Sequence, residues 1–486
     1  MLKQLTRLGS VLQGAPLARN FGALTLSQGL GRVVRFLYLI IVARILGPAD
    51  VGVFVYGVAL YLGLSGLAGF GQGVLLSTRL GKSRREASRM VSHSLAVVLV
   101  MASFAMGLGL GSVWAGEHEM KVVQALGLLV LTLVPRSIVV WVRHCYVALE
   151  DAGWIPRYEL VFRGGEALAG TAVLFLWGDL RVVCAIHLSA WLIEAVVALR
   201  KLTGVGGFSL VPGRNLRLLK HIFRVSLYFM LSLWLVNLSA QVGILGLGLL
   251  REEAATVGYF GTAMQFVTTF LLLPFAFGQA FLPSLSRGYH RGGPAPAVLT
   301  FVIKGLLVAG GFIALLAHSY GAWIVTWLLG DRFAAAGEVF ASLSWAIGPY
   351  AVTLLAVQAL NGIGGRNLAT VLALAIVAVQ VTLLIALLPL GALVAATAAL
   401  VAAAVLGCLL GILFIHRRLG IRGHGWWLHP LIAIAGTGAA ISLGMPPEPW
   451  TAPAAAALLG LLIWRLGVFR GADLDLIRDR LQAAAG

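Results

Sequence analysis

The sequence predicts an all-α polytopic membrane protein with about 14 transmembrane helices. We expect two six-helix lobes related by a parallel pseudo-two-fold repeat, followed by two C-terminal helices. The 486 residues are 60% hydrophobic and only 11% charged, a balance that soluble proteins do not have. The apolar residues form runs long enough to cross a bilayer as helices. In addition, two pairs of short motifs recur at nearly the same spacing in the two halves of the chain.

The apolar runs are separated by charged residues or by Gly and Pro. The length that a bilayer requires predicts approximate spans at residues 20–46, 51–78, 91–115, 121–144, 156–177, 181–200, 221–250, 254–285, 297–318, 338–361, 367–389, 391–415, 428–444 and 451–469. We expect the amphipathic piece Trp323–Leu329 to lie at the membrane surface. The tail after Arg470 has apolar residues at helical spacing and Asp473 as an N-cap, which predicts an interfacial helix.

The formal net charge of +18 comes from Lys and Arg clustered in alternate loops. Clusters of this kind mark cytoplasmic loops, so we expect no nucleic-acid partner. The cation-rich side holds Lys3, Arg7, Arg19, Arg79, Lys82, Arg84, Arg85, Arg89, Arg200, Lys201, Arg214, Arg217, Lys220, Arg287, Arg291, Arg417, Arg418 and Arg422. The opposite loops hold few cations and many acids, which predicts that both termini are cytoplasmic.

The internal repeat is visible in two pairs of landmarks. Val51–Phe54 and Phe70–Gly73 in the first half correspond to Val257–Phe260 and Phe277–Ala280 in the second. Six spans precede the second copy, so both copies keep the same orientation and the repeat is parallel. We therefore expect an N-terminal lobe at residues 1–203, a C-terminal lobe at 204–420, and helices 13 and 14 with a cytoplasmic amphipathic tail at 421–486.

Two arginines lie in the middle of the first predicted span. Gln28, Arg32 and Arg35 follow i, i+4, i+7 and share one helical face. On the seventh span Asn237 and Gln241 form a matching stripe, and Arg35 corresponds to about Gln241 in the repeat. If both stripes face the interface between the lobes, they line a positively charged cavity. Arginine suits pyrophosphate because its planar fork donates two hydrogen bonds, and amides suit sugar hydroxyls.

The alternative for Arg32 and Arg35 is a structural one, in which they neutralise buried acids such as Glu166 or Glu194. The cost of two cations at mid-depth without such partners favours substrate binding. Gln72 and Gln279, near the cytoplasmic ends of spans two and eight, are candidates for the cavity mouth or for helix contacts alone.

Arg136 and Arg163 lie about two turns inside the cytoplasmic ends of their spans, and we interpret them as structural. From there an arginine can extend to the lipid headgroups. Arg163 can also pair with Glu159 or Glu166 on its own helix.

Other motifs do not support catalysis. Gly81-Lys82-Ser83 resembles the end of a phosphate-binding loop, but Leu76 occupies the required first glycine position. The three cysteines are isolated and interpreted as packing residues, and the ten histidines are scattered without ligand spacing. We therefore predict no catalytic residue, no metal and no cofactor.

The segment from Ser27 to Phe54 resembles the opening of the polysaccharide transporter family, in the multidrug/oligosaccharidyl-lipid/polysaccharide exporter superfamily. The resemblance is carried by Arg44-Ile45-Leu46-Gly47-Pro48 at the end of the first span and by the step Gly52-Val53-Phe54. It implies a bacterial plasma-membrane flippase for lipid-linked oligosaccharides. It also implies two six-helix lobes in a V around a cavity lined by spans one, two, seven and eight.

The leading hypothesis is therefore a flippase that moves an anionic polyprenyl-pyrophosphate-linked oligosaccharide outward, for surface polysaccharides such as O-antigen or exopolysaccharide. Its partners would be the lipid-linked substrate, membrane lipids, a polysaccharide polymerase and glycosyltransferases. A lipid II flippase is the closer alternative, because it needs the same cationic cavity. A cation-coupled multidrug antiporter is disfavoured, since spans one, two, seven and eight lack carboxylates away from their ends. A membrane glycosyltransferase or polymerase is disfavoured by the short loops.

Overall fold

The computed structural model describes residues 16–79, 84–116, 119–149, 151, 153–204, 208, 210–271, 295–419, 429–430, 432–434, 437 and 451–468. Within these ranges every regular element is a helix, as predicted. Several predictions lie outside the described residues: most of span 13, the tail after Arg470, Gln279 and the side chain of Gln28.

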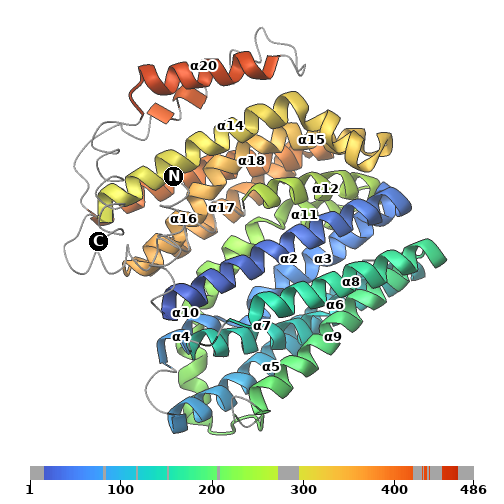
Figure 1. Cartoon of the computed structure of the whole chain (residues 1–486), viewed down its shortest axis with the longest axis vertical. Coiled ribbons are helices and arrows are strands. Elements are labelled where there is room, and N and C mark those ends of the chain that lie inside the picture. The colour runs from blue at the N-terminus through green and yellow to red at the C-terminus, as the bar shows by residue number, and fades with distance from the viewer. Residues whose placement is uncertain are drawn as a thin grey trace, which may run out of the picture. The chain divides into compact units, whose positions relative to one another are not determined.

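The helices cover most of each described range (Figure 1). They are α2 Pro16–Leu46, α3 Pro48–Gly69, α4 Gln72–Arg79, α5 Arg84–Ala115, α6 Met120–Leu131, α7 Leu133–Ala148, α8 Ile155–Trp177, α9 Leu180–Gly204, α10 Leu216–Ser239, α11 Val242–Leu249, α12 Ala254–Phe270, α14 Ala295–Leu329, α15 Ala334–Leu343, α16 Ile347–Gly362, α17 Arg366–Leu387, α18 Ala392–Leu419 and α20 Thr451–Arg465.

In the described part of the chain, nine helical segments are long and apolar enough to cross a membrane, and a bent pair in α10 brings the number to ten. The protein is thus a multi-pass membrane protein. Trp323–Leu329 is the C-terminal end of α14, which continues through it to Leu329. Its location at the membrane surface stays a prediction.

Four of the predicted spans consist of two helices each; in the tenth, α15 and α16 are joined by the 3-10 turn Ser344–Ala346. The fourth span breaks between α6 and α7, where Pro135 lacks the N–H that would bond the Leu131 carbonyl and its ring clashes with that group. The second span breaks between α3 and α4 at Phe70 and Gly71, whose φ angles are 43° and 66°. The seventh breaks at Gln241, between α10 and α11. Broken helices in transporters accompany binding sites near the membrane centre.

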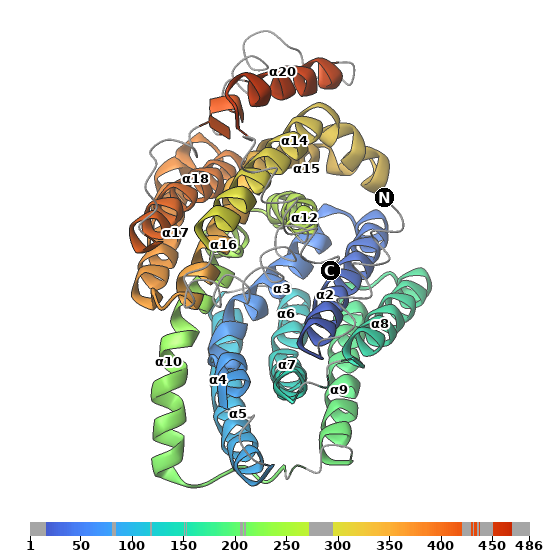
Figure 2. The same cartoon turned by 60° about the vertical axis from the view of Figure 1, so that its left-hand side comes forward.

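Contacts divide the chain into two compact units, Asn20–Thr262 and Ala263–Gly486, the latter joined by Met1–Arg19. The predicted lobe boundaries at residues 203 and 420 stay predictions. In the Asn20–Thr262 unit, α3 packs against α5, α6, α7, α10 and α11. Figure 2 shows α7 between α5 and α9, both of which it contacts. The core among these three helices includes Val91, Trp141, Cys145 and Ala198.

The other unit packs by close helix contacts at small residues. α14 contacts α15 and α16, and α18 contacts α16 and α17. Gly310 lies against Gly348, Gly407 against Thr353 and Gly411 against Ala356. Such small residues allow helix backbones to approach closely in a membrane.

The repeat appears as a reciprocal contact between α3 and α12. A methyl group added at Gly52 would lie 1.7 Å from the Ala254 carbonyl oxygen, and one added at Gly258 would lie 2.1 Å from that of Pro48. Each glycine therefore meets the residue four positions before its counterpart. An isologous contact of this kind is the signature of a two-fold axis, and it supports the predicted parallel repeat.

Candidate functional site: a buried chain of charged side chains

Helix α8 presents three of its charged residues to the protein interior. Glu159, Arg163 and Glu166 follow the i, i+4, i+7 spacing of one helical face, and all three are buried. The opposite face is apolar and uncovered, with Val161 67% and Leu168 76% exposed. In a bilayer this arrangement is favourable, because lipid solvates the apolar face while the bundle encloses the charges.

Neighbouring helices supply the counter-charges. Glu194 and His187 lie two turns apart on one face of α9, and both are buried. Arg143 comes from α7, with 15% of its side chain exposed. Arg35 comes from α2 and is 40% exposed. The site therefore draws on helices that are well separated in sequence but packed together in the Asn20–Thr262 unit.

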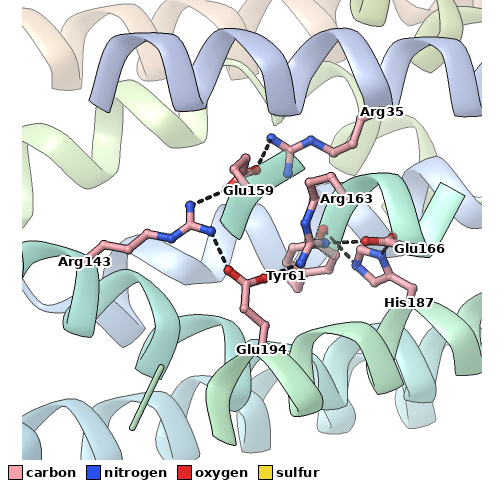
Figure 3. A network of polar contacts seen from close by, with 8 residues as sticks. All are labelled: Arg35, Tyr61, Arg143, Glu159, Arg163, Glu166, His187 and Glu194. Atoms are coloured by element: carbon pink, nitrogen blue, oxygen red, sulfur yellow. Dashed lines mark hydrogen bonds and ion pairs between the residues drawn. The ribbon is translucent and has the colours of Figure 1, made fainter. Parts of the chain in front are cut away.

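The charges alternate in sign along a chain (Figure 3). Arg35 Nη2 lies 3.8 Å from Glu159 Oε1, and Arg143 Nη1 lies 2.5 Å from Glu159 Oε2. Arg143 Nη2 and Arg163 Nη2 each lie 2.5 Å from one oxygen of Glu194. Arg163 also donates to Glu166. We call the series Arg35–Glu159–Arg143–Glu194–Arg163–Glu166–His187 the charged chain.

The charged chain ends at an imidazole. His187 Nδ1 lies 2.5 Å from Glu166 Oε1, and His187 Nε2 lies 3.2 Å from the Tyr61 hydroxyl on α3. Trp191 packs beside His187. The centroid of its ring lies 3.9 Å from the guanidinium carbon of Arg163. Arg136 lies 5.7 Å from the ring centroids of both Tyr61 and Trp191.

Glycines make room for this assembly on both helices of the α2–α8 contact. A methyl group added at Gly31 would lie 2.3 Å from Glu159 Oε1, so the carboxylate rests against the α2 backbone one turn from Arg35. A methyl group added at Gly170 would lie 2.0 Å from the Tyr38 hydroxyl. Larger residues at either position would separate α2 from α8 and Glu159 from Arg35.

The electrostatic balance of the charged chain depends on every member. A buried ion costs several kcal/mol in desolvation unless a partner of opposite charge compensates it. Glu159, Glu166 and Glu194 are matched by Arg35, Arg143 and Arg163, which makes the chain neutral when His187 is neutral. Arg35 is thus part of this balance although it is the most exposed member.

The structure places the predicted site residues in different settings. Arg32 and Arg35 are both half-buried near the middle of α2. Glu166 and Glu194, the acids that the sequence offered as their partners, instead contact Arg163, Arg143 and His187. Arg35 contacts the carboxylate of Glu159.

The predicted amides lie elsewhere. Gln72 is buried, donates to Ser226 on α10 at 3.0 Å and accepts from Ser94 on α5 at 2.9 Å. Trp141 on α7 donates to Ser94 at 2.9 Å. This chain joins four helices and supports the helix-contact alternative for Gln72. Asn237 is exposed on α10, and Gln241 is half-buried at the start of α11.

Arg163 does not extend to the headgroups, because its side chain is fully buried and turned into the bundle. Its predicted pairing with Glu166 is present. The sequence reasoning missed Arg143, Tyr61 and His187 as members of the site. The available signal was that α8 carries polar residues on one face and that α9 carries two polar residues seven positions apart, His187 and Glu194, which share a helical face. Nothing in the local sequence indicated Tyr61.

A model of the family described as polysaccharide biosynthesis protein matches residues 17–289, more than half of the chain. The chain belongs to this family. The match confirms the resemblance seen in the first span. Among curated proteins none matches the chain.

Solved transporters share the fold of this chain. An inward-facing multidrug resistance MATE family transporter is 15% identical with a TM-score of 0.67, covering 82% of this chain and all of its own. The lipid II flippase MurJ, in an inward closed conformation, is 11% identical with a TM-score of 0.65, covering 91% of this chain and 97% of its own. A MATE transporter in a bent conformation is 16% identical with a TM-score of 0.54, covering 88% of this chain and 98% of its own. The fold is therefore one that multidrug transporters and a lipid II flippase also have.

Proposed function

We propose that this protein is a flippase that moves an anionic polyprenyl-pyrophosphate-linked oligosaccharide from the cytoplasmic to the outer leaflet by alternating access. The product would serve cell-surface polysaccharide biosynthesis at the bacterial plasma membrane. Glycosyltransferases that build the lipid-linked substrate and a polymerase that consumes it are the proposed functional partners. Membership of the polysaccharide biosynthesis family supports the class of substrate.

One observation carries the proposal. Arg35 lies near the middle of a spanning helix, yet 40% of its side chain is uncovered and its carboxylate partner is 3.8 Å away. A guanidinium that is so loosely held can turn toward a phosphate and donate two hydrogen bonds to it. Arg32 lies one turn before it on the same face of α2. Two adjacent cations suit the two charges of a disubstituted pyrophosphate.

The membrane potential supports movement in the outward direction. Moving one negative charge outward across an inside-negative membrane gains about 2.3 kcal/mol per 100 mV. The two charges of the pyrophosphate therefore gain roughly twice that amount without hydrolysis of a nucleotide.

The buried carboxylates disfavour a multidrug antiporter. Among the described residues, Glu159, Glu166 and Glu194 are the buried acids, and each contacts an arginine. A cationic drug would have to displace those arginines. Lipid II has the same pyrophosphate linkage as the proposed substrate, so the two candidates differ in the glycan.

Reconstitution tests the function directly. The purified protein is placed in liposomes with a polyprenyl-pyrophosphate oligosaccharide that carries a fluorophore on its terminal sugar, and outward movement is read by dithionite quenching. We expect flipping by the wild type, loss in Arg35→Ala, and partial activity in Arg35→Lys, which keeps charge but not bidentate geometry. Arg44→Ala, an exposed arginine at the end of the same helix, is the control and should stay active.

Two results would contradict the proposal. If the wild type moves neither this substrate nor labelled lipid II, the protein is not a flippase of this class. Full activity of Arg32→Ala/Arg35→Ala would show that these two arginines do not bind the substrate. Movement of lipid II alone would assign the alternative substrate.

A further inference from the structure

Arg35 belongs both to the proposed substrate site and to the charged chain. Its 3.8 Å contact with Glu159 is the longest in the chain, where most deeper contacts measure 2.5 Å. It is also the most exposed member. The ion pair at the substrate end is therefore the easiest one to exchange, and a phosphate that binds Arg35 competes with Glu159 for it.

Departure of Arg35 changes the charge of the buried groups that stay behind. Glu159, Glu194 and Glu166 then face only Arg143 and Arg163. In an interior of low dielectric, the loss of one positive charge strengthens the attraction of every remaining group for a cation. The bound phosphates add negative charge at the same end. Both effects favour uptake of a proton.

The other end of the chain holds a group that can accept it. Imidazole is the side chain that in its unperturbed state changes charge near neutral pH. With His187 neutral, Nδ1–H donates to Glu166 and the Tyr61 hydroxyl donates to Nε2. With His187 protonated, Nε2–H donates to the same hydroxyl after the Tyr61 proton rotates away. Both protonation states are thus satisfied without movement of a heavy atom.

Other charged and aromatic groups also surround His187. Glu166 and Arg163 face it from α8, Tyr61 and the ring of Phe54 from α3, and Arg136 from α7 through the rings of Tyr61 and Trp191. From α2, Tyr38 lies against Gly170 on α8 and Arg35 lies against Glu159. Arg136 opposes a second positive charge whether or not Arg35 is present. The departure of Arg35 from Glu159 therefore decides whether proton binding at His187 is strengthened or weakened.

We propose that His187 is a proton-binding site whose occupancy is coupled to the substrate site through the charged chain. When Arg35 leaves Glu159 for a phosphate, Nε2 of His187 takes a proton from solvent, and it returns the proton when Arg35 comes back. The inference rests on the proposed function, since it requires an anionic ligand at Arg35. By linkage, lower pH must then strengthen binding of that ligand.

Calorimetry on the full-length protein in detergent tests the coupling. The probe is a farnesyl-pyrophosphate-linked disaccharide, whose disubstituted pyrophosphate does not titrate near neutrality. Titrations in buffers of different ionisation enthalpy give the number of protons taken up per ligand. We expect up to about one proton in the wild type, with affinity rising as pH falls, by at most about tenfold per pH unit.

His187→Gln keeps hydrogen-bonding capacity but cannot titrate, so the probe should bind without proton uptake. A second readout needs no variant: Trp191 lies 6.4 Å from His187 between ring centroids, and protonation of the imidazole should quench its fluorescence when the probe binds. Trp191→Phe removes that signal and serves as its control.

The outcomes separate the two proposals. Binding without proton uptake in the wild type overturns the coupling and leaves the flippase function standing. Uptake that persists in His187→Gln but disappears in Glu159→Gln places the proton on Glu159 and overturns the assignment to His187. A wild type that neither binds the probe nor flips the labelled substrate overturns the proposed function, and the coupling with it.

Discussion

Replacement of Arg163 by Met should lower the free energy of unfolding by about 3–5 kcal/mol, the usual effect of removing one partner from a buried ion pair. The side chain is fully buried, contacts Glu166 and Glu194, and lies against Trp191. Methionine keeps the apolar contact with the ring but leaves two carboxylates short of a cation. Each hydrogen bond to a charged group contributes about 1.5–3 kcal/mol, and two of them reproduce that range.

A second substitution isolates the electrostatic part of this loss. In Arg163→Met/Glu166→Gln the carboxylate that loses its only arginine is neutralised, while Glu194 keeps Arg143. The double variant should therefore be more stable than Arg163→Met alone, with a coupling energy of about 0.5–3 kcal/mol. Both variants are measured by SDS titration in detergent micelles, with far-UV circular dichroism as the signal.

The matched control is an exposed ion pair located where α8 ends and α9 begins. Arg181 and Asp179 lie 2.6 Å apart, with 40% and 33% of their side chains exposed. The hydrogen bonds from Arg181 hold the pKa of Asp179 below its usual range, but solvent screens such pairs. Arg181→Met should leave the unfolding transition unchanged. Equal losses in Arg181→Met and Arg163→Met would falsify the assignment of the stability to buried charge.

The remaining predictions concern close packing and topology. Gly52→Ala should lower the unfolding midpoint, because the new methyl group meets the Ala254 carbonyl oxygen at 1.7 Å, whereas Gly111→Ala has open space and should be neutral or stabilising; equal effects would show that α3 and α12 do not touch there. Gly31→Ala should displace Glu159 from Arg35 and therefore weaken the pH dependence of probe binding, because the ligand then has no Arg35–Glu159 contact to break, while Gly164→Ala, which has open space, should leave that dependence unchanged. Reporter fusions at residues 9 and 484 should both read cytoplasmic, and a periplasmic signal from either would refute the topology drawn from loop charges.

Much of the fold could be predicted because membrane helices leave a strong one-dimensional signal. Hydropathy located α8, α9, α17 and α18 to within a few residues. The breaks inside spans were harder to predict, since they depend on local backbone geometry. Phe70 adopts a φ of 43° although it is not a glycine, and it is held there by burial against Phe223, 4.5 Å away between ring centroids. No sequence pattern specifies such a tertiary contact.

The site was predictable only in part for a related reason. Arg35 could be identified as a candidate site residue because a charged side chain within an apolar span is unusual. Its partner Glu159 was not, because it lies more than 120 residues away in sequence and near a span end, where a carboxylate needs no explanation. His187 was interpreted as one of many scattered histidines. Its importance follows from Glu166 and Tyr61, which reach it from two other helices.

The second copy of the repeat indicates what the fold itself requires. In the predicted repeat, spans eleven and twelve, α17 and α18, correspond to α8 and α9 of the first copy, and from residue 367 to residue 415 the sequence has no Asp, Glu, Lys, Arg or His. These helices pack through small residues such as Gly407 and Gly411. A pair of helices in this architecture can therefore form its core without ions. Because burying charges is costly and apolar replacements are often as stable, the buried charges of α8 and α9 are better explained by coupling to an anionic substrate than by stability.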